Sequence, residues 1–181
     1  MPRTRLVSFW KPGWQSGLNS TPFHRVYFVD DLEAGIERLP QNLFYLPIVA
    51  QWSLFIGKGL VSKVYYRYYF DSFGLQAHTL QPELPYTFKK FWTLRPFYRF
   101  HVQSSNDYFK PFAEHSIEDS YYTSDWDMAQ FTSQKLGMSL QYYPLYPLFG
   151  NMEFIELRYL HFWRSDGLRS RALSLGTRFT F

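Results

Sequence analysis

Hydrophobic and polar residues alternate with a period of two along most of the chain. The last ten residues show the pattern clearly, because the odd positions are mostly apolar and the even positions are polar or small. The odd positions are Leu173, Leu175, Thr177, Phe179 and Phe181, and the even positions are Ser174, Gly176, Arg178 and Thr180. Successive side chains of a β-strand point to opposite faces, so this segment is predicted to be a strand with one apolar and one polar face. Such a strand is typical of proteins that cross a membrane as a β-barrel.

Six earlier segments alternate in the same way and bring the number of predicted strands to seven. The seven segments are residues 44–56, 60–70, 75–88, 91–103, 130–143, 152–164 and 172–181. Residues 5–15 supply an eighth candidate. Pro82 and Pro85 weaken the third segment, since proline donates no hydrogen bond to a neighbouring strand. Strands of about 9 to 14 residues are long enough to cross a bilayer when they are tilted.

These strands predict a single all-β domain over residues 1–181, folded as an antiparallel up-and-down transmembrane β-barrel. Residues 1–16 hold the candidate first strand, residues 17–42 form a loop, and residues 43–181 hold the seven alternating strands. Short turns are expected at residues 57–59, 88–90 and 144–151, and a long polar loop at residues 104–127. Barrels in outer membranes have short periplasmic turns and longer external loops, so we expect the polar loop outside.

A soluble lipocalin-like barrel that binds an apolar ligand is the main alternative, because alternation alone does not reveal which face points inward. Two features favour the membrane orientation. The polar face carries only one or two Lys or Arg residues per strand, which is sparse for a solvated exterior. The apolar face carries Trp52, Trp92 and Trp163, which are bulky for the interior of a narrow barrel.

The composition agrees with a membrane barrel. Aromatic residues make up 22% of the chain, and Trp and Tyr suit the two headgroup levels of a bilayer. The mean hydropathy of -0.32 fits a barrel, in which every second residue is polar, and no run approaches a spanning helix of about 20 apolar residues. The net charge of +4 comes from dispersed basic residues, so no nucleic-acid partner is expected.

The first ten residues lack the apolar run and the small-residue cleavage site of a signal peptide. A barrel destined for the outer membrane needs an export signal. We therefore expect the chain to be the C-terminal part of a larger barrel. Prior removal of the export segment and a soluble cytoplasmic protein are the alternatives.

Several stretches resemble the domain-of-unknown-function 3570 family of bacterial outer-membrane β-barrels. They are TPFHRVYF (21–28), ERLP (37–40), YRYYFDSFGLQAHTL (66–80), RPFYRF (95–100), SNDYF (105–109), YYTSDWD (121–127) and ELRYLHFWRSDGL (156–168). The resemblance implies a barrel fold and a location in the bacterial outer membrane. The end of the chain also resembles the signal read by the barrel assembly machinery, with Leu175, Phe179 and Phe181 as its residues. The expected partners are thus that machinery and the lipid bilayer.

Ten charged or titratable residues fall on the polar face and are predicted to line the lumen of the barrel. They are Lys63, Arg67, Glu83, Arg95, Arg99, His101, Lys135, Glu156, Arg158 and Arg178. One interpretation is that these groups pair with one another inside a packed barrel. The other is a porin-like lumen that favours anions, because seven basic residues face two carboxylates when His101 is left uncounted.

No catalytic residue, cofactor or metal site is predicted. Ser72 and His78 are the best pair for a barrel hydrolase, but two residues six apart do not define a catalytic geometry. The acidic residues of the loop from Asn106 to Asp127 lack the regular spacing of a calcium loop, so a solvated external loop is expected. The prediction is an uncharacterised outer-membrane β-barrel protein with a structural or porin-like role.

Overall fold

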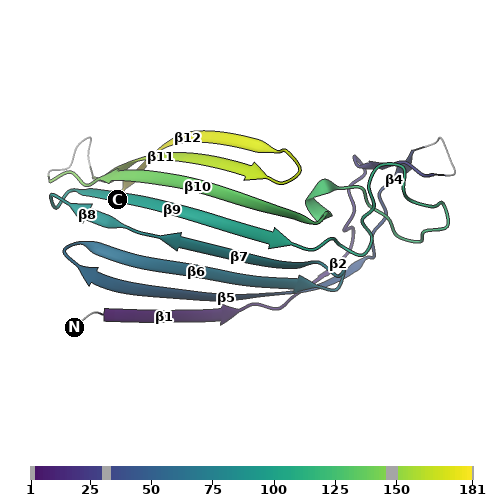
Figure 1. Ribbon diagram of the computed structural model, residues 1–181, viewed down its shortest axis with the longest axis horizontal. Coiled ribbons are helices and arrows are strands. Elements are labelled where there is room, and N and C mark those ends of the chain that lie inside the picture. The colour runs from purple at the N-terminus through teal and green to yellow at the C-terminus, as the bar shows by residue number, and fades with distance from the viewer. Residues whose placement is uncertain (1–2, 30–33, 146–150, 181) are drawn as a thin grey trace.

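A computed structural model describes residues 3–29, 34–145 and 151–180. Its main feature is one ten-stranded antiparallel sheet with the path β1-β5-β6-β7-β9-β10-β11-β12. The strands are β1 (Arg3–Trp10), β2 (Gly13–Ser16), β5 (Asn42–Gly57), β6 (Leu60–Asp71), β7 (Gln76–Glu83), β8 (Tyr86–Phe88), β9 (Trp92–Gln103), β10 (Phe131–Tyr142), β11 (Met152–Arg164) and β12 (Arg169–Phe179). The strands run in sequence order across Figure 1, so the all-β, antiparallel, up-and-down prediction is confirmed.

The strands lie where the alternation predicted them. The third predicted strand is divided into β7 and β8 at Leu84 and Pro85, and both halves keep one register against β9. The break follows from the prolines, which offer no amide hydrogen to the neighbouring strand. Across the break the carbonyl of Pro85 accepts a hydrogen bond from the amide of Val61 at 2.9 Å, so pairing to β6 continues.

The sheet is open in the part of the chain that the structure describes. β1 pairs only with β5, and β12 pairs only with β11, so these two strands form the edges. To close a barrel, β1 and β12 would have to pair with each other or with further strands. The predicted closed barrel is therefore not confirmed, and the confirmed architecture is a broad, single-layer antiparallel sheet.

The connections between strands fall into two groups, one at each end of the sheet (Figure 1). The β5–β6 and β8–β9 turns are tight and lie at one end, while the β6–β7 turn, the β11–β12 turn and the long loops lie at the other. The chain turns sharply at Gly59, whose φ of +81° suits glycine, and a Cβ there would overlap the carbonyl of Thr87. The turns at residues 57–59 and 88–90 match the predicted ones, and most of the predicted turn at residues 144–151 lies outside the described residues. The side of a membrane on which each end lies stays a prediction.

The two long loops are packed together into a lobe at one end of the sheet, which we define as the described residues of 17–42 and 104–129. The lobe contains β3 (Arg25–Val26), β4 (Gly35–Ile36) and a 3-10 helix, η1 (Trp126–Met128). Arg38 and Tyr122 exchange backbone hydrogen bonds of 3.1 and 2.7 Å between the two segments. Val26, Leu39, His115 and Thr123 are buried, so the lobe has a small interior of its own. The sequence predicted solvated loops here and gave no sign of this interior.

Within the described residues, no helix is long and apolar enough to span a membrane.

Candidate functional site

The two faces of the sheet differ in exposure in the opposite sense to a water-soluble sheet: many apolar side chains are exposed and several polar ones are buried. We call this inverted exposure. On β10, Ser133, Ser139 and Gln141 are buried, whereas Leu136 and Met138 on the other face are about half exposed. The exposed apolar side chains continue across the neighbouring strands. They include Trp52, Leu80, Phe100, Leu157, Tyr159, Leu173 and Leu175. In a water-soluble sheet the apolar face would be the buried one.

Strand register places all ten predicted lumen-lining residues on the polar face. Lys63 lies opposite Glu83, Arg99 opposite Lys135, and Arg158 opposite Ser139 in the adjacent strands. The period of two is sufficient for this result, since the register shifts at Phe55–Gly57 and Met152–Phe154 lie outside the stretches that carry these ten residues. The shared face of these residues was therefore predictable from the sequence, but their distances from one another were not.

Six of the ten residues line two adjoining cavities on this face. One cavity of about 260 Å³ is lined by Glu83, Arg95, Arg99, Lys135 and Arg158, and another of about 310 Å³ by Lys63, Glu83, Arg95 and Arg99. We call these two cavities the basic pocket. Uncharged polar residues also line it, namely Gln51, Tyr65, Gln81 and Ser139. The sequence prediction omitted these four residues, although the same alternation places them on the polar face.

The remaining four predicted residues lie outside the basic pocket. Arg67 stacks over the Tyr69 ring at 5.3 Å, and a ring nitrogen of His101 is 2.9 Å from the hydroxyl of Thr79. Glu156 pairs with Arg158 at 2.9 Å. Arg178 is largely exposed and lies 3.7 Å from Glu153. The structure thus distributes these residues along the polar face and does not gather them at one point.

Positive charge in the basic pocket is only partly balanced. Lys63 lies 3.9 Å from Glu83, and Glu156 is already paired with Arg158. Among the described residues, Arg95, Arg99 and Lys135 form no ion pair. Arg99 donates from Nε to Oε1 of Gln81 at 2.7 Å, while the buried Nε of Arg95 has no hydrogen-bond partner. A buried donor without a partner is costly, so an anion or water in this pocket would meet an unsatisfied group.

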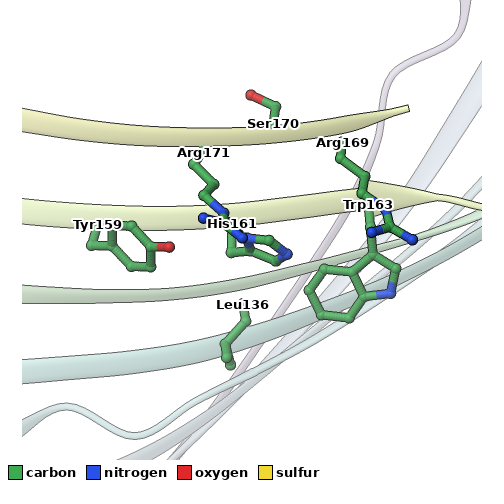
Figure 2. A pocket seen from close by; sticks show the side chains of 7 residues that line it. All are labelled: Leu136, Tyr159, His161, Trp163, Arg169, Ser170 and Arg171. Carbon is green, nitrogen blue, oxygen red and sulfur yellow. Dashed lines mark hydrogen bonds between the residues drawn. The ribbon is translucent and has the colours of Figure 1, made fainter. Parts of the chain in front are cut away.

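A larger hollow of about 780 Å³ lies on the apolar face beside the open edge of β12 (Figure 2). Arg169 and Arg171 come from β12, and Trp163 and His161 from the paired strand β11. Nε of Arg171 is 3.3 Å from Nδ1 of His161. Alternation in the sequence does not reveal this basic and aromatic group, because the group interrupts the apolar face at the lobe end of the sheet.

The hydrolase pair is not assembled. Oγ of Ser72 accepts a hydrogen bond from the amide of Phe44 at 3.0 Å, and Nδ1 of His78 is 2.8 Å from the hydroxyl of Tyr66. No hydrogen bond in the described part of the chain joins Ser72 to His78. A nucleophile and its base need such contact, so the geometry offers no support for acyl transfer at these residues.

Acidic side chains of the long loop have separate partners and do not converge on one calcium position. Asp119 accepts from Lys110 at 2.7 Å, and Asp127 pairs with Arg164 at 2.5 Å. The hydrogen bonds from Lys110 and then His115 lower the pKa of Asp119 from 3.8 to about 2. Asp125 faces His24 from the other segment of the lobe.

Of the proposed assembly signal, Leu175 and Phe179 lie on the exposed edge strand β12, and Phe181 lies outside the described residues. Their role in assembly stays a prediction.

Comparison with known families decides the relationship that the sequence motifs suggested. The chain matches the family described as "Protein of unknown function (DUF3570)" over residues 11–145, which is about three quarters of its length. The chain belongs to the DUF3570 family. The matched region runs from just before β2 to just after β10 and includes both segments of the lobe. It omits β11 and β12, so the resemblance proposed for residues 156–168 lies outside it. No curated protein and no solved structure gave a significant match.

Proposed function

We propose that this DUF3570 protein forms the wall of a β-barrel in the bacterial outer membrane, with the apolar face against lipid and the polar face toward an aqueous lumen. The observation that carries this proposal is the inverted exposure of the two faces. Leucine, methionine and aromatic side chains are exposed on one face, while serine and glutamine side chains of the same strands are buried on the other. Contact with the hydrocarbon of a bilayer gives such an apolar face a lower free energy than contact with water does.

The length of the strands supports the same assignment. β9 and β10 each contain 12 residues and β11 contains 13. A tilted strand needs about 9 to 11 residues to cross the hydrocarbon core, so each of these strands is long enough. Aromatic side chains near the strand ends, such as Trp163 and Trp92, suit the headgroup level.

A porin-like role that favours anions is the specific function we propose for the lumen. Lys63, Arg95, Arg99, Lys135 and Arg158 surround the basic pocket, and among the described residues only Glu83 offers a carboxylate there. A ring of positive side chains lowers the energy of an anion in a narrow aqueous path and raises that of a cation. We further propose that the barrel assembly machinery inserts the protein, with Leu175 and Phe179 contributing to recognition.

Paired single cysteines test the orientation of the faces, because the native chain has no cysteine. Leu157 and Arg158 are adjacent in β11, point to opposite faces, and are both about half exposed. We would introduce Leu157→Cys or Arg158→Cys, attach a fluorophore, and reconstitute the protein in vesicles whose acyl chains carry a nitroxide quencher. The proposal expects strong quenching at position 157 and weak quenching at position 158. Equal or reversed quenching would reject it and favour a soluble barrel with an apolar interior.

A further inference from the structure

Three side chains that are distant in the sequence converge inside the lobe. Nδ1 of His24 lies 3.7 Å from Oε1 of Glu37 and 3.7 Å from Oδ2 of Asp125. The three atoms all lie within 4.8 Å of one another. His24 precedes β3, Glu37 follows β4, and Asp125 caps η1, so both segments of the lobe contribute.

Glu37 is the central residue of this group, since its side chain is only 2% exposed. Its Oε2 accepts a hydrogen bond from the amide of Thr21 at 2.8 Å, and its Oε1 accepts one from the hydroxyl of Thr123 at 2.5 Å. Among the described residues, His24 is the only basic side chain within 4 Å of this carboxylate. A buried carboxylate is expensive unless a positive charge balances it. The site therefore favours a cation.

Backbone and hydroxyl groups hold the three side chains in place. The amide of Glu37 donates to the carbonyl of His24 at 3.2 Å, which fixes the two residues beside each other. Thr123 is fully buried, and its hydroxyl also accepts a hydrogen bond from the amide of Asp125 at 3.0 Å. One threonine thus positions two of the three groups. Supporting hydrogen bonds of this kind are usual around the ligands of metal sites.

We propose that His24, Glu37 and Asp125 bind a divalent transition metal of the zinc class, which joins the two segments of the lobe. One imidazole nitrogen and two carboxylate oxygens form a ligand set that Zn²⁺ accepts, with water completing a tetrahedron. Ligands at about 2.0 to 2.1 Å from a tetrahedral ion are roughly 3.3 to 3.5 Å apart. The two 3.7 Å separations are close to that value, and the half-exposed His24 has room to adjust. Calcium prefers an all-oxygen site with more ligands, so it fits less well.

Zinc titration of the full refolded chain, with Zn²⁺ as the only added ligand, tests the site. The proposal expects saturable binding of one ion, weakened at least about tenfold by His24→Gln. His78→Gln is the matched control, because His78 is an exposed histidine on the sheet and should leave binding unchanged. Substitution by Co²⁺ should give the visible absorption of a tetrahedral ion in the native chain and the control, but not in His24→Gln.

A second readout keeps the test independent of the porin-like function. Zn²⁺ should slow proteolysis of residues 104–129 in the native chain and not in His24→Gln, since the ion binds the folded lobe. If His24→Gln fails to fold, Asp125→Asn replaces it. Zinc binding that is absent, or equal in the native and substituted chains, would overturn the proposal, as would preferential binding of Ca²⁺.

Discussion

Met138 and Ser139 are consecutive residues of β10, yet Met138 is 50% exposed and Ser139 is 4% exposed. Their Cβ atoms point to opposite faces of the sheet, so the difference reflects the two environments that the faces offer. On the polar face, Ser139 lines the same cavity as the long side chains of Arg95, Arg99, Lys135 and Arg158. The apolar side chains of the other face are exposed in the described part of the chain. In the proposed membrane orientation, hydrocarbon would contact them.

Leu157→Arg tests whether the apolar face contacts lipid. A positive charge in the hydrocarbon region loses most of its hydration, so the free energy of unfolding in vesicles should fall by about 2 to 4 kcal/mol. The measurement is urea unfolding of the reconstituted protein, followed by tryptophan fluorescence. Thr132→Arg is the matched control, since Thr132 lies on the same face at the lobe end of β10, where the expected cost is about 0 to 1 kcal/mol. A loss of the same size at both positions would contradict lipid contact at Leu157.

Gly137→Ala tests packing on the polar face. A Cβ at Gly137 would overlap the ring of Phe97 and press on the side chain of Leu160. Overpacking of this kind costs about 1 to 3 kcal/mol of unfolding free energy. Gly176→Ala is the control, because a Cβ at Gly176 meets no atom within 4 Å and should change stability by less than about 0.5 kcal/mol. Equal stability of the two variants would show that Phe97 moves aside without cost.

Asp119 makes the stability of the lobe depend on pH. Its pKa of about 2 in the folded protein lies below the ordinary value of 3.8, chiefly because Lys110 and then His115 hydrogen-bond to the carboxylate. The stabilisation is therefore complete above about pH 4 and is lost as the pH falls toward 2. Hydrogen exchange of residues 110–124 should accelerate over this range relative to Asp119→Asn at the same pH. An identical pH profile for the native chain and Asp119→Asn would refute the assignment.

Asp166 also loses its favourable hydrogen bond at low pH, but the effect of Asp166 on hydrogen exchange is expected in a different segment from that of Asp119. Arg164 lowers the pKa of Asp166 through a hydrogen bond, but Asp166 lies in the β11–β12 turn. Its titration should affect exchange in that turn and leave residues 110–124 unchanged. Exchange data resolved by segment therefore separate the two carboxylates.

Anion preference of the lumen should depend on the basic pocket. Removing two unpaired charges with Arg99→Gln and Lys135→Gln should lower the ratio of anion to cation permeability by a factor on the order of five. Reversal potentials in planar bilayers under a salt gradient give this ratio. The control is Arg169→Gln with Arg171→Gln, which removes the same charge from the apolar face. Cation preference or absent conductance in the native protein would reject the anion lumen.

The sequence by itself determined the strands of the large sheet from β5 onward, their approximate ends and the face of each side chain, but not β3 and β4, which lie in a predicted loop. This was possible because the period of two is a local property of the extended backbone, repeated in the predicted strands from residue 42 onward. Pro82 and Pro85 indicated a weak point in the third predicted strand, where the structure divides β7 from β8, because proline has no amide hydrogen to donate. The charged residues of the polar face followed from the alternation, including all ten predicted positions.

Tertiary structure alone decided which residues come within bonding distance. Thr123 reaches Glu37 across 86 positions in the sequence, and no periodic pattern links the two segments of the lobe. The sequence therefore predicted solvated loops where the structure has a buried histidine, a buried carboxylate and a candidate metal site. Pairing between the two edge strands is likewise a long-range property, and β1 and β12 do not pair with each other in the described part of the chain. Alternation fixes the faces of a sheet, but its curvature and closure depend on the sum of twist, register and strand number.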